Sequence, residues 1–457
     1  MLTVGSRSRT EITLLAGLAL PIALSLVLRS AMAVIDTMIV AQYSAVELAA
    51  VGVGSALWLS TFAFVSGALL ITAPIVSARH GASDTASIGG EVDQLLWFAL
   101  GLGAFGLSAI NLLALALPHL GVEPELAFRA ASYLHLVSLA MPGAALFQVG
   151  RYASEGLKLL ATPTLIAVAG FAINVVLSCW LVFGGLGLPA MGSAGCALAT
   201  VGTMWLMAAA MIFSLSRGRR YRELKLVRLR RVDPVRQAAL IRRGIPVGIM
   251  LLLEVGIFGL VAVASGRLGA QAAASHQIAI SIANLLFMVP LALSLAIAIR
   301  VAHLRGAGEE GSAQLSARYG VGMCAILSLG FAGALIAAAP FIAHQSVRDA
   351  EVAAIAAQLL WLAAFLQLAD SLQVAFAGVL RGYGDTFTPM LITLGAFWAF
   401  GVPLGLWLAF ASPQLELTGL WIGLLAGIAA AAGALGLRTR TLVRAHSVPG
   451  SLMLSAG

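Results

Sequence analysis

The segment GIPVGIMLLLEVGIFGLVAVASG, residues 244–266, determines the class of fold. Nearly all its side chains are apolar, and at ~1.5 Å per residue the segment is long enough to cross the hydrocarbon core of a bilayer. One acid, Glu254, lies in its middle. Placing an ionisable group at this depth costs on the order of 3 kcal/mol, so the group needs a partner, a proton or a cation. The segment therefore predicts a transmembrane helix with a functional carboxyl group.

Composition extends this interpretation to the whole chain. Of 457 residues, 60 % are hydrophobic and only 10 % are charged, and the mean hydropathy is +0.99. A soluble domain carries about 25 % charged residues, and here too little polar sequence remains to cover a large soluble core. The three cysteines lie in apolar runs, which indicates neither a disulfide framework nor a metal site. We therefore expect an all-α polytopic membrane protein.

The apolar runs predict twelve transmembrane helices. The first run continues from Leu14 past Met32 without a small-residue cleavage site, so we interpret it as a span and not as a cleaved leader. Between the sixth and seventh runs lies a connector with 11 basic residues between Arg217 and Arg243. The expected spans are 12–40, 46–78, 92–117, 125–150, 161–185, 193–216, 244–267, 272–303, 319–343, 351–379, 387–411 and 417–437.

The basic residues predict the orientation. With twelve spans and a cytoplasmic N-terminus, all but four of the 27 Lys and Arg residues fall on or near the cytoplasmic side, as the positive-inside rule requires. The exceptions are Arg29, which lies inside a span, and Arg129, Arg267 and Arg348. Both termini are therefore expected in the cytoplasm. Basic loops also explain the net charge of +8 without binding of nucleic acid.

The two halves of the chain repeat. Pro21 aligns with Pro246 and Phe62 with Phe287 at an offset of 225 residues, and Thr162 aligns with Thr388 at an offset of 226. Because six spans is an even number, both halves share one orientation, which predicts a pseudo-twofold axis along the membrane normal and a central cleft. The predicted domains are a six-helix lobe at 11–216, a basic cytoplasmic linker at 217–243, and a second six-helix lobe with a cytoplasmic tail at 244–457.

Three acids lie well inside predicted spans: Asp36, Glu254 and Asp370. Carboxyl groups in membrane helices usually mark an ion or proton pathway. Such a group can exchange a proton for Na⁺ or for an organic cation, because each occupant neutralises the same charge. The alternative is a carboxyl group that only bonds neighbouring helices. For Asp36, a structural pair with Arg29 two turns away is a further alternative.

Polar residues on other spans would complete a site around these acids. Gln277 lies on the eighth predicted span, and Asn174 and Thr200 lie on the fifth and sixth. Side chains of these types also serve as packing contacts between membrane helices, so both interpretations remain open.

The sequence contains no enzyme motif. There is no zinc spacing, no nucleophile elbow and no HExxH motif. Residues 381–386, RGYGDT, contain two glycines but lack the GxxxxGK[ST] spacing and a preceding strand. We interpret them as a turn that ends the tenth span.

Several segments together resemble the multidrug and toxic compound extrusion (MATE) transporters, specifically the NorM-type branch. They are spread over nearly all of the chain, and their order fits the family's twelve-helix, two-lobe pattern. The matching segments are Pro21 through VIDT at 34–37, Pro246-x7-Glu254, SHQ at 275–277, IRV at 299–301 with Gly306-x-Gly308, and DSLQ at 370–373 running into LRGY at 380–383.

The resemblance implies where a coupling ion binds. The family's cation site in the carboxy-terminal lobe corresponds to Glu254 and Asp370, with Gln277 nearby, and Na⁺ or H⁺ would bind there. Its acid in the amino-terminal lobe corresponds to Asp36. The residues implied for a secondary cation or substrate site are Asn174, Thr200 and Asp349, the last in an outer loop.

Two positions depart from the family's pattern. Leu366 stands where some relatives have a tyrosine that helps to hold a cation, and Ser178 stands for the second asparagine of the amino-terminal site. The choice between Na⁺ and H⁺ coupling therefore stays open.

The resemblance implies cation-coupled efflux of amphipathic, often cationic compounds by alternating access. We expect a monomer in the cytoplasmic (inner) membrane with no cofactor besides the coupling ion. The first alternative is a lipid-linked precursor flippase of the same superfamily, which should line its cleft with several basic residues, whereas Arg29 is the only one deep in a predicted span. The second is a membrane scaffold or receptor, which would not need midplane acids in duplicated halves.

Overall fold

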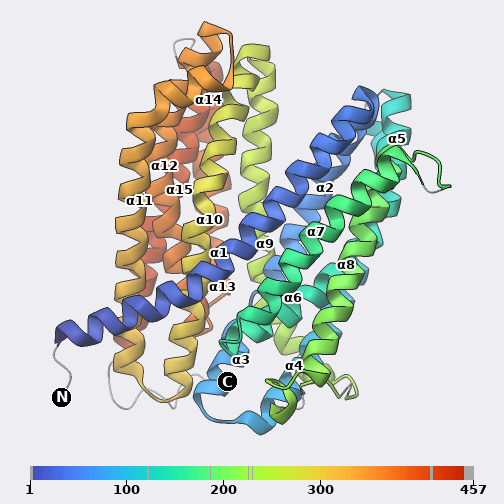
Figure 1. Ribbon diagram of the computed structural model, residues 1–457. Coiled ribbons are helices and arrows are strands. Elements are labelled where there is room, and N and C mark those ends of the chain that lie inside the picture. Colours follow the sequence, from blue (N-terminus) through green and yellow to red (C-terminus); the bar gives the residue numbers. More distant parts are fainter. Residues whose placement is uncertain are drawn as a thin grey trace. The chain divides into compact units, whose positions relative to one another are not determined.

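Every regular element in the computed structural model is a helix (Figure 1). The structure describes residues 4–120, 123–185, 187–224, 226–228, 230–411 and 415–446, without the side chains of residues 4–8, 120 and 223. Within these ranges the helical content confirms the expected all-α class.

The helices are those of a multi-pass membrane protein. In the described ranges, eleven helices are long and apolar enough to cross a membrane, and one bent pair brings the number to 12 if it forms a single span. Large apolar side chains on these helices are exposed, for example Leu20 at 70 %, Phe213 at 67 % and Ile326 at 71 %. Such a surface is stable against lipid and would aggregate in water.

Contacts divide the chain into two compact units. One consists of Met1–Ala23 with Leu253–Gly457, and the other is Leu24–Leu252. The predicted lobes at 11–216 and 244–457 stay a prediction, and the tail from residue 447 onward lies outside the described residues. Two helices, α1 (Val4–Tyr43) and α9 (Pro234–Arg267), contribute residues to both units.

Unit 24–252 contains, besides parts of α1 and α9, the helices α2 (Ala45–Leu69), α3 (Thr72–Gly81), α4 (Thr85–Ala116), η1 (Leu117–Leu120), α5 (Pro124–Ser138), α6 (Ala140–Gly156), α7 (Ala161–Phe183), α8 (Gly192–Arg217) and η2 (Arg222–Leu224). The other unit contains α10 (Ala270–Gly306), α11 (Glu310–Ser346), α12 (Ala350–Tyr383), α13 (Phe387–Thr393), the π-helical segment η3 (Leu394–Gly401), α14 (Val402–Ala411) and α15 (Glu416–His446).

The bent pair consists of α5 and α6, which meet at 42°. Pro142 explains the break because it lacks the N–H that would bond the carbonyl of Ser138, where α5 ends. The nearby carbonyl of Leu139 accepts a hydrogen bond from the indole N–H of Trp205 on α8, at 2.9 Å. A break inside a membrane segment is tolerated when another helix satisfies the exposed backbone in this way.

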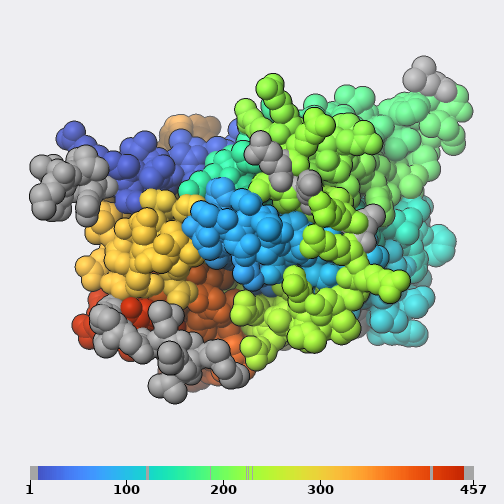
Figure 2. All heavy atoms as spheres, turned by 90° about the horizontal axis from the view of Figure 1, so that it is seen from below, coloured from blue at the N-terminus to red at the C-terminus, as the bar shows by residue number. Residues whose placement is uncertain are grey.

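The basic connector lies against the start of α4. The buried carboxylate of Asp93 accepts the backbone N–H of Arg228 at 2.9 Å. The neighbouring Gln94 donates to the carbonyl of Arg231 at 2.9 Å and accepts the N–H of Asp233 at 3.0 Å. Figure 2 shows the connector in yellow-green beside the start of α4 in blue. Two polar side chains of α4 thus replace the water that would otherwise solvate this backbone.

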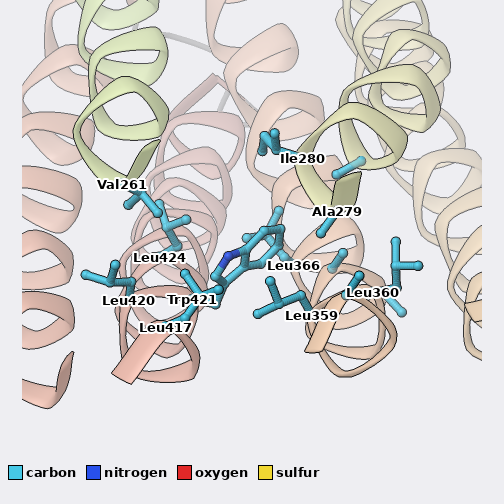
Figure 3. Packing of buried hydrophobic residues seen from close by; sticks show 14 of the residues in the cluster. Val261, Ala279, Ile280, Leu359, Leu360, Leu366, Leu417, Leu420, Trp421 and Leu424 are labelled. Carbon is cyan, nitrogen blue, oxygen red and sulfur yellow. The ribbon is translucent and has the colours of Figure 1, made fainter. Parts of the chain in front are cut away.

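The other unit has an apolar core around Trp421 of α15, which is fully buried. Side chains of α9, α10, α12 and α15 surround the indole ring, among them Val261, Ile280 and Leu366 (Figure 3). The ring of His276 contacts the tryptophan edge-on, with 5.7 Å between the ring centroids. This core packs together the helices that carry Glu254 and Asp370.

Small residues bring α15 into close contact with α14 and with the end of η3. A Cβ atom on Gly423 of α15 would lie 2.3 Å from the Cα atom of Gly405 on α14. One turn farther along, a Cβ atom on Gly427 would lie 3.1 Å from the Cα atom of Gly401. Glycines four residues apart permit this backbone approach, which is a common way to pack helices in membranes.

We predict that Gly423→Ala lowers the thermal stability of the purified protein in detergent, at a cost of about 1–3 kcal/mol, because the methyl group forces two backbones apart. The matched control is Gly433→Ala on the same helix, where an added Cβ meets no atom within 4 Å. Its Tm should stay the same or rise, because alanine favours helix. Equal losses in both variants would contradict the packing argument.

Candidate cation site

Asp370 is the centre of an unsatisfied polar segment on α12. Its side chain is 4 % exposed, and its Oδ1 atom has no hydrogen-bond partner among the described residues. The same holds for the hydroxyl group of Ser371 and for both polar side-chain atoms of Gln373. A buried polar atom without a partner costs about 1–3 kcal/mol. A proton or a cation at Asp370 would reduce this cost.

Glu254 of α9 lies near Asp370. The two carboxyl groups are close enough for their negative charges to repel each other, and Arg381 of α12 is close enough to attract Glu254. The guanidinium group of Arg381 is buried and donates to the hydroxyl oxygen of Ser294 on α10 at 3.2 Å. The structure thus brings together the two acids that the sequence indicated, and it adds a basic residue that the sequence placed in a terminal turn.

The turn itself is present as predicted. Gly384 ends α12 with φ at 85°, a left-handed conformation that glycine adopts without strain, and its N–H bonds the carbonyls of Leu380 and Arg381.

Gln277 and Asp349 have other partners. Gln277 is exposed, and its amide group donates to the hydroxyl oxygen of Ser281 at 3.3 Å. Asp349 is exposed and caps α12 by accepting the backbone N–H groups of Glu351 at 2.9 Å and Val352 at 3.2 Å. These contacts give both residues a local structural role, and their predicted roles in binding stay predictions.

Asp36 of α1 is buried among polar residues of α7 and α8. The hydroxyl group of Ser178 donates to Asp36 Oδ1 at 2.6 Å. Asn174 and Thr200 lie beside the same carboxyl group. The hydroxyl group of Thr200 donates to the carbonyl of Cys196 at 3.1 Å, whereas both amide atoms of Asn174 are buried without a hydrogen bond among the described residues. The predicted neighbours of Asp36 therefore do surround it.

The alternative pairing of Asp36 with Arg29 is not formed. Among the ion pairs of the described residues, Asp36 has no basic partner, and the guanidinium group of Arg29 lies over the ring of Phe62, 5.4 Å from its centroid. Asp36 is held by Ser178 instead.

A buried ion pair on α6 was missed by the sequence analysis, which placed Arg151 with the cytoplasmic basic residues. Its Nη1 atom donates to Glu155 Oε1 at 2.8 Å, and both side chains are less than 5 % exposed. Opposite charges four residues apart were the available signal, but that spacing is also typical of exposed helix faces. Sequence alone does not distinguish the two settings.

A helical protein with many spans and carboxyl groups buried in them has the architecture of a membrane transporter. Comparison with known families agrees. The family model MatE matches residues 21–180 and again residues 246–407, so that its two matches begin at the prolines aligned by the internal repeat. The chain belongs to the MatE family of MATE transporters.

Individual relatives cover nearly the whole chain. Multidrug resistance protein PmpM of Pseudomonas aeruginosa is 36 % identical over 458 residues, which cover 97 % of this chain and 95 % of PmpM. A crystal structure of MATE in the bent conformation has a TM-score of 0.86 at 18 % identity and covers 98 % of this chain and 99 % of that one. The eukaryotic MATE transporter AtDTX14 has a TM-score of 0.85 at 21 % identity and covers 97 % and 99 %. The two structures establish the fold.

We predict that Glu155→Gln destabilises the protein by about 3–5 kcal/mol, because it leaves the Arg151 guanidinium buried without its counter-charge. Thermal unfolding in detergent measures the loss. The matched control is Glu125→Gln, which breaks another pair of the same spacing, with Arg129, where Glu125 is 63 % exposed. That variant should unfold at the wild-type temperature.

A double change provides the second control for this pair. Replacing both partners by apolar residues, Arg151→Met with Glu155→Leu, should recover most of the stability, since no charge then remains buried. If Glu155→Gln and Glu125→Gln unfold at the same temperature, the buried pair does not contribute as argued.

Proposed function

We propose that the chain is a cation-coupled antiporter that exports amphipathic, often cationic compounds by alternating access. Membership of the MatE family supports transport, and the name of PmpM, a multidrug resistance protein, supports drugs as substrates. The observation that carries the coupling is the buried carboxyl group of Asp370, which lacks a hydrogen-bond partner at Oδ1 and repels the neighbouring Glu254.

The electrostatics of this pair provide a mechanism. Two negative charges in a low-dielectric interior repel, so a proton, Na⁺ or an organic cation that neutralises one of them lowers the energy of the site. These occupants compete because they compensate the same charge. A coupling ion drives transport only if it binds the inward-open and outward-open states differently. A change in the surroundings of Asp370 between the two states would supply that difference.

Either Na⁺ or H⁺ fits the chemistry of the site. The carboxylate and amide oxygens of Asp370, Glu254 and Gln373 are ligands that hard cations accept. Leu366, where a tyrosine could contribute to a cation site, is 2 % exposed and belongs to the apolar core, so it offers no ligand atom. A protonated carboxyl group needs fewer ligands than Na⁺, and this favours proton coupling.

The proposal also covers the membrane location, the orientation of the termini and the oligomeric state. The basic residues of the connector and of the terminal segments support a location in the cytoplasmic membrane with both termini inside. One copy of the chain contains both repeats and all the proposed coupling acids, so a monomer is sufficient for transport. Asp36, with Asn174 and Thr200, would form a second cation or substrate site.

A lipid-linked precursor flippase is the second candidate. Buried Arg151 and Arg381 add basic groups that such a protein would need for phosphate binding. However, Arg151 is paired with Glu155, and Arg381 lies in the field of Glu254. Two of the three basic groups within the spans are therefore compensated by carboxylates of the protein itself, which favours the antiporter, whereas Arg29 has no acidic partner among the ion pairs of the described residues.

We predict that liposomes with the purified protein move ethidium when a Na⁺ gradient or a proton gradient is imposed, and that Glu254→Gln and Asp370→Asn reduce this movement to the protein-free leak. The control Glu309→Gln neutralises an exposed acid whose side chain forms no cap at the start of α11, and it should transport as wild type does.

The two gradients are applied separately, so that the effective one names the coupling ion. Wild-type rates in both site variants would overturn the assignment of the site. If wild type moves no ethidium with either gradient while a control pump does, the flippase becomes the better hypothesis. Asp36→Asn in the same assay tests whether the amino-terminal acid takes part.

A further inference from the structure

The basic connector presents a dense group of arginines on the surface of unit 24–252. Residues 217–243 contain 11 basic and two acidic residues. Ten of the basic side chains, from Arg217 to Arg243, are exposed among the residues whose side chains the structure describes. Within the same residues, the connector forms ion pairs only at Arg230 and Arg236. The protein itself therefore leaves most of this positive charge uncompensated.

Two of the arginines converge on one point of α4. Gly90, in the second turn of that helix, has no side chain, and an added Cβ atom would lie 2.7 Å from Nη1 of Arg230 and 3.6 Å from Nη1 of Arg236. Two guanidinium groups so close together repel each other. An anion with several oxygen atoms would bind both groups and remove this repulsion.

The acids beside this point compensate the two arginines only in part. The carboxylate of Asp93 lies 3.9 Å from Nε of Arg230 and already accepts the backbone N–H groups of Arg228 and Arg230. The carboxylate of Asp233 lies 3.3 Å from Nε of Arg236 and accepts the backbone N–H of Val235. Both acids thus also bond the backbone of the connector, and both guanidinium groups are about half exposed.

Contacts with α4 determine the depth of the arginine pair in the membrane. The indole N–H of Trp97 donates to the carbonyl of Arg230 at 2.9 Å, and Gln94 donates to the carbonyl of Arg231. The predicted span of this helix begins at residue 92, so Trp97 lies at the boundary between membrane and water, where tryptophan is enriched. The arginine pair is therefore held at the level of the lipid headgroups.

Apolar side chains beside the arginines are also exposed. Val232 is 49 % exposed, Val235 is 79 % exposed and Ile241 is 50 % exposed. A segment that combines basic and apolar residues at this depth is typical of protein that lies in the membrane interface, with its apolar side chains against the acyl chains. An acidic protein or a nucleic acid would leave these apolar groups in water. The surface therefore favours lipid as the partner.

We propose that Arg230 and Arg236 together bind the phosphate of an anionic lipid in the cytoplasmic leaflet. A guanidinium group forms two parallel hydrogen bonds with a phosphate, and basic residues near an anionic leaflet add attraction to the neighbouring headgroups. The inference goes beyond the export of drugs. It rests on the proposed cytoplasmic location of the connector.

Native mass spectrometry of the purified full-length protein tests this site, because it resolves single bound lipids. The probes are phosphatidylglycerol and phosphatidylcholine with the same acyl chains, of which only the first has a net negative charge. Wild type should bind the first phosphatidylglycerol at least about tenfold more tightly than phosphatidylcholine. Arg230→Gln combined with Arg236→Gln should abolish most of this preference and leave the affinity for phosphatidylcholine unchanged.

The matched control removes the same charge elsewhere. Arg318→Gln combined with Arg440→Gln changes two exposed arginines of the other unit, on α11 and α15, and should keep the wild-type preference. Equal loss in both double variants would mean that total charge and not this site selects the lipid, which would overturn the proposal. Arg230→Lys combined with Arg236→Lys keeps the charge without the planar guanidinium groups and should retain part of the preference.

A measurement on wild type covers the case in which the glutamine variant does not fold. Rising ammonium acetate concentration should weaken binding of phosphatidylglycerol more steeply than binding of phosphatidylcholine, and equal slopes would contradict the proposal.

Two competitors separate lipid from other anions. Glycerol phosphate has the phosphate without acyl chains, and displacement of phosphatidylglycerol by an equal concentration of it would identify a site for soluble phosphates and reject the inference. Tighter binding of polyglutamate than of phosphatidylglycerol, lost in the glutamine variant, would assign the arginines to an acidic protein segment and also reject it.

The binding assay is independent of the proposed function. It uses no gradient, and the site should bind phosphatidylglycerol in detergent whichever side of the membrane it faces in the cell. Failure of ethidium transport therefore tests the antiporter, whereas absence of a preference for phosphatidylglycerol tests only this surface.

Discussion

The low dielectric constant of the bilayer determines how this backbone folds and where charged side chains are tolerated. Backbone groups find no water there, so every regular element in the described ranges is a helix, and the break before Pro142 is covered by an indole N–H from α8. The same constraint acts on charge. Glu155 compensates Arg151, Ser178 holds Asp36, and Arg29 lies over an aromatic ring. Asp370 has a carboxyl oxygen without such a partner among the described residues.

The two repeats differ in the charged residues that they place within the membrane-spanning helices. One half has an acid at the position where the other half has Arg29, and it has Arg381 at the position where the other half has Glu155. The two halves therefore carry opposite charges at equivalent positions of the repeat.

Much of this was predictable from the sequence, because hydropathy and charge placement report directly on the bilayer. The spans, the all-α class and the turn at Gly384 follow from run length and from the preferences of glycine. Helix ends were less predictable. Hydropathy marks where the membrane ends, whereas backbone hydrogen bonding continues into water, so α11 begins at Glu310 and not near residue 319. The burial of Arg151 with Glu155 depends on packing from other helices, which the local sequence does not encode.

The candidate site likewise combines features that the sequence predicts with features that it does not. Glu254 and Asp370 could be identified from the sequence because charged residues are rare in apolar runs. The structure places these two carboxyl groups near each other. The direction in which Gln277 faces was not visible. A polar residue in an apolar helix can bond its own helix four residues on, as Gln277 does with Ser281, as readily as it can bond a ligand. Spacing along a helix selects candidates, and the neighbouring helices decide among them.

The attachment of the basic connector to α4 has a practical consequence for labelling. Asp93 and Gln94 bond the backbone of Arg228 and Arg231, so these residues are attached to unit 24–252. A fluorophore or spin label placed there reports on that unit alone. It would not detect strain in the link between the repeats, although the labelled residues lie in that link in the sequence. A reporter of that strain belongs instead on α9, the helix to which both units contribute residues.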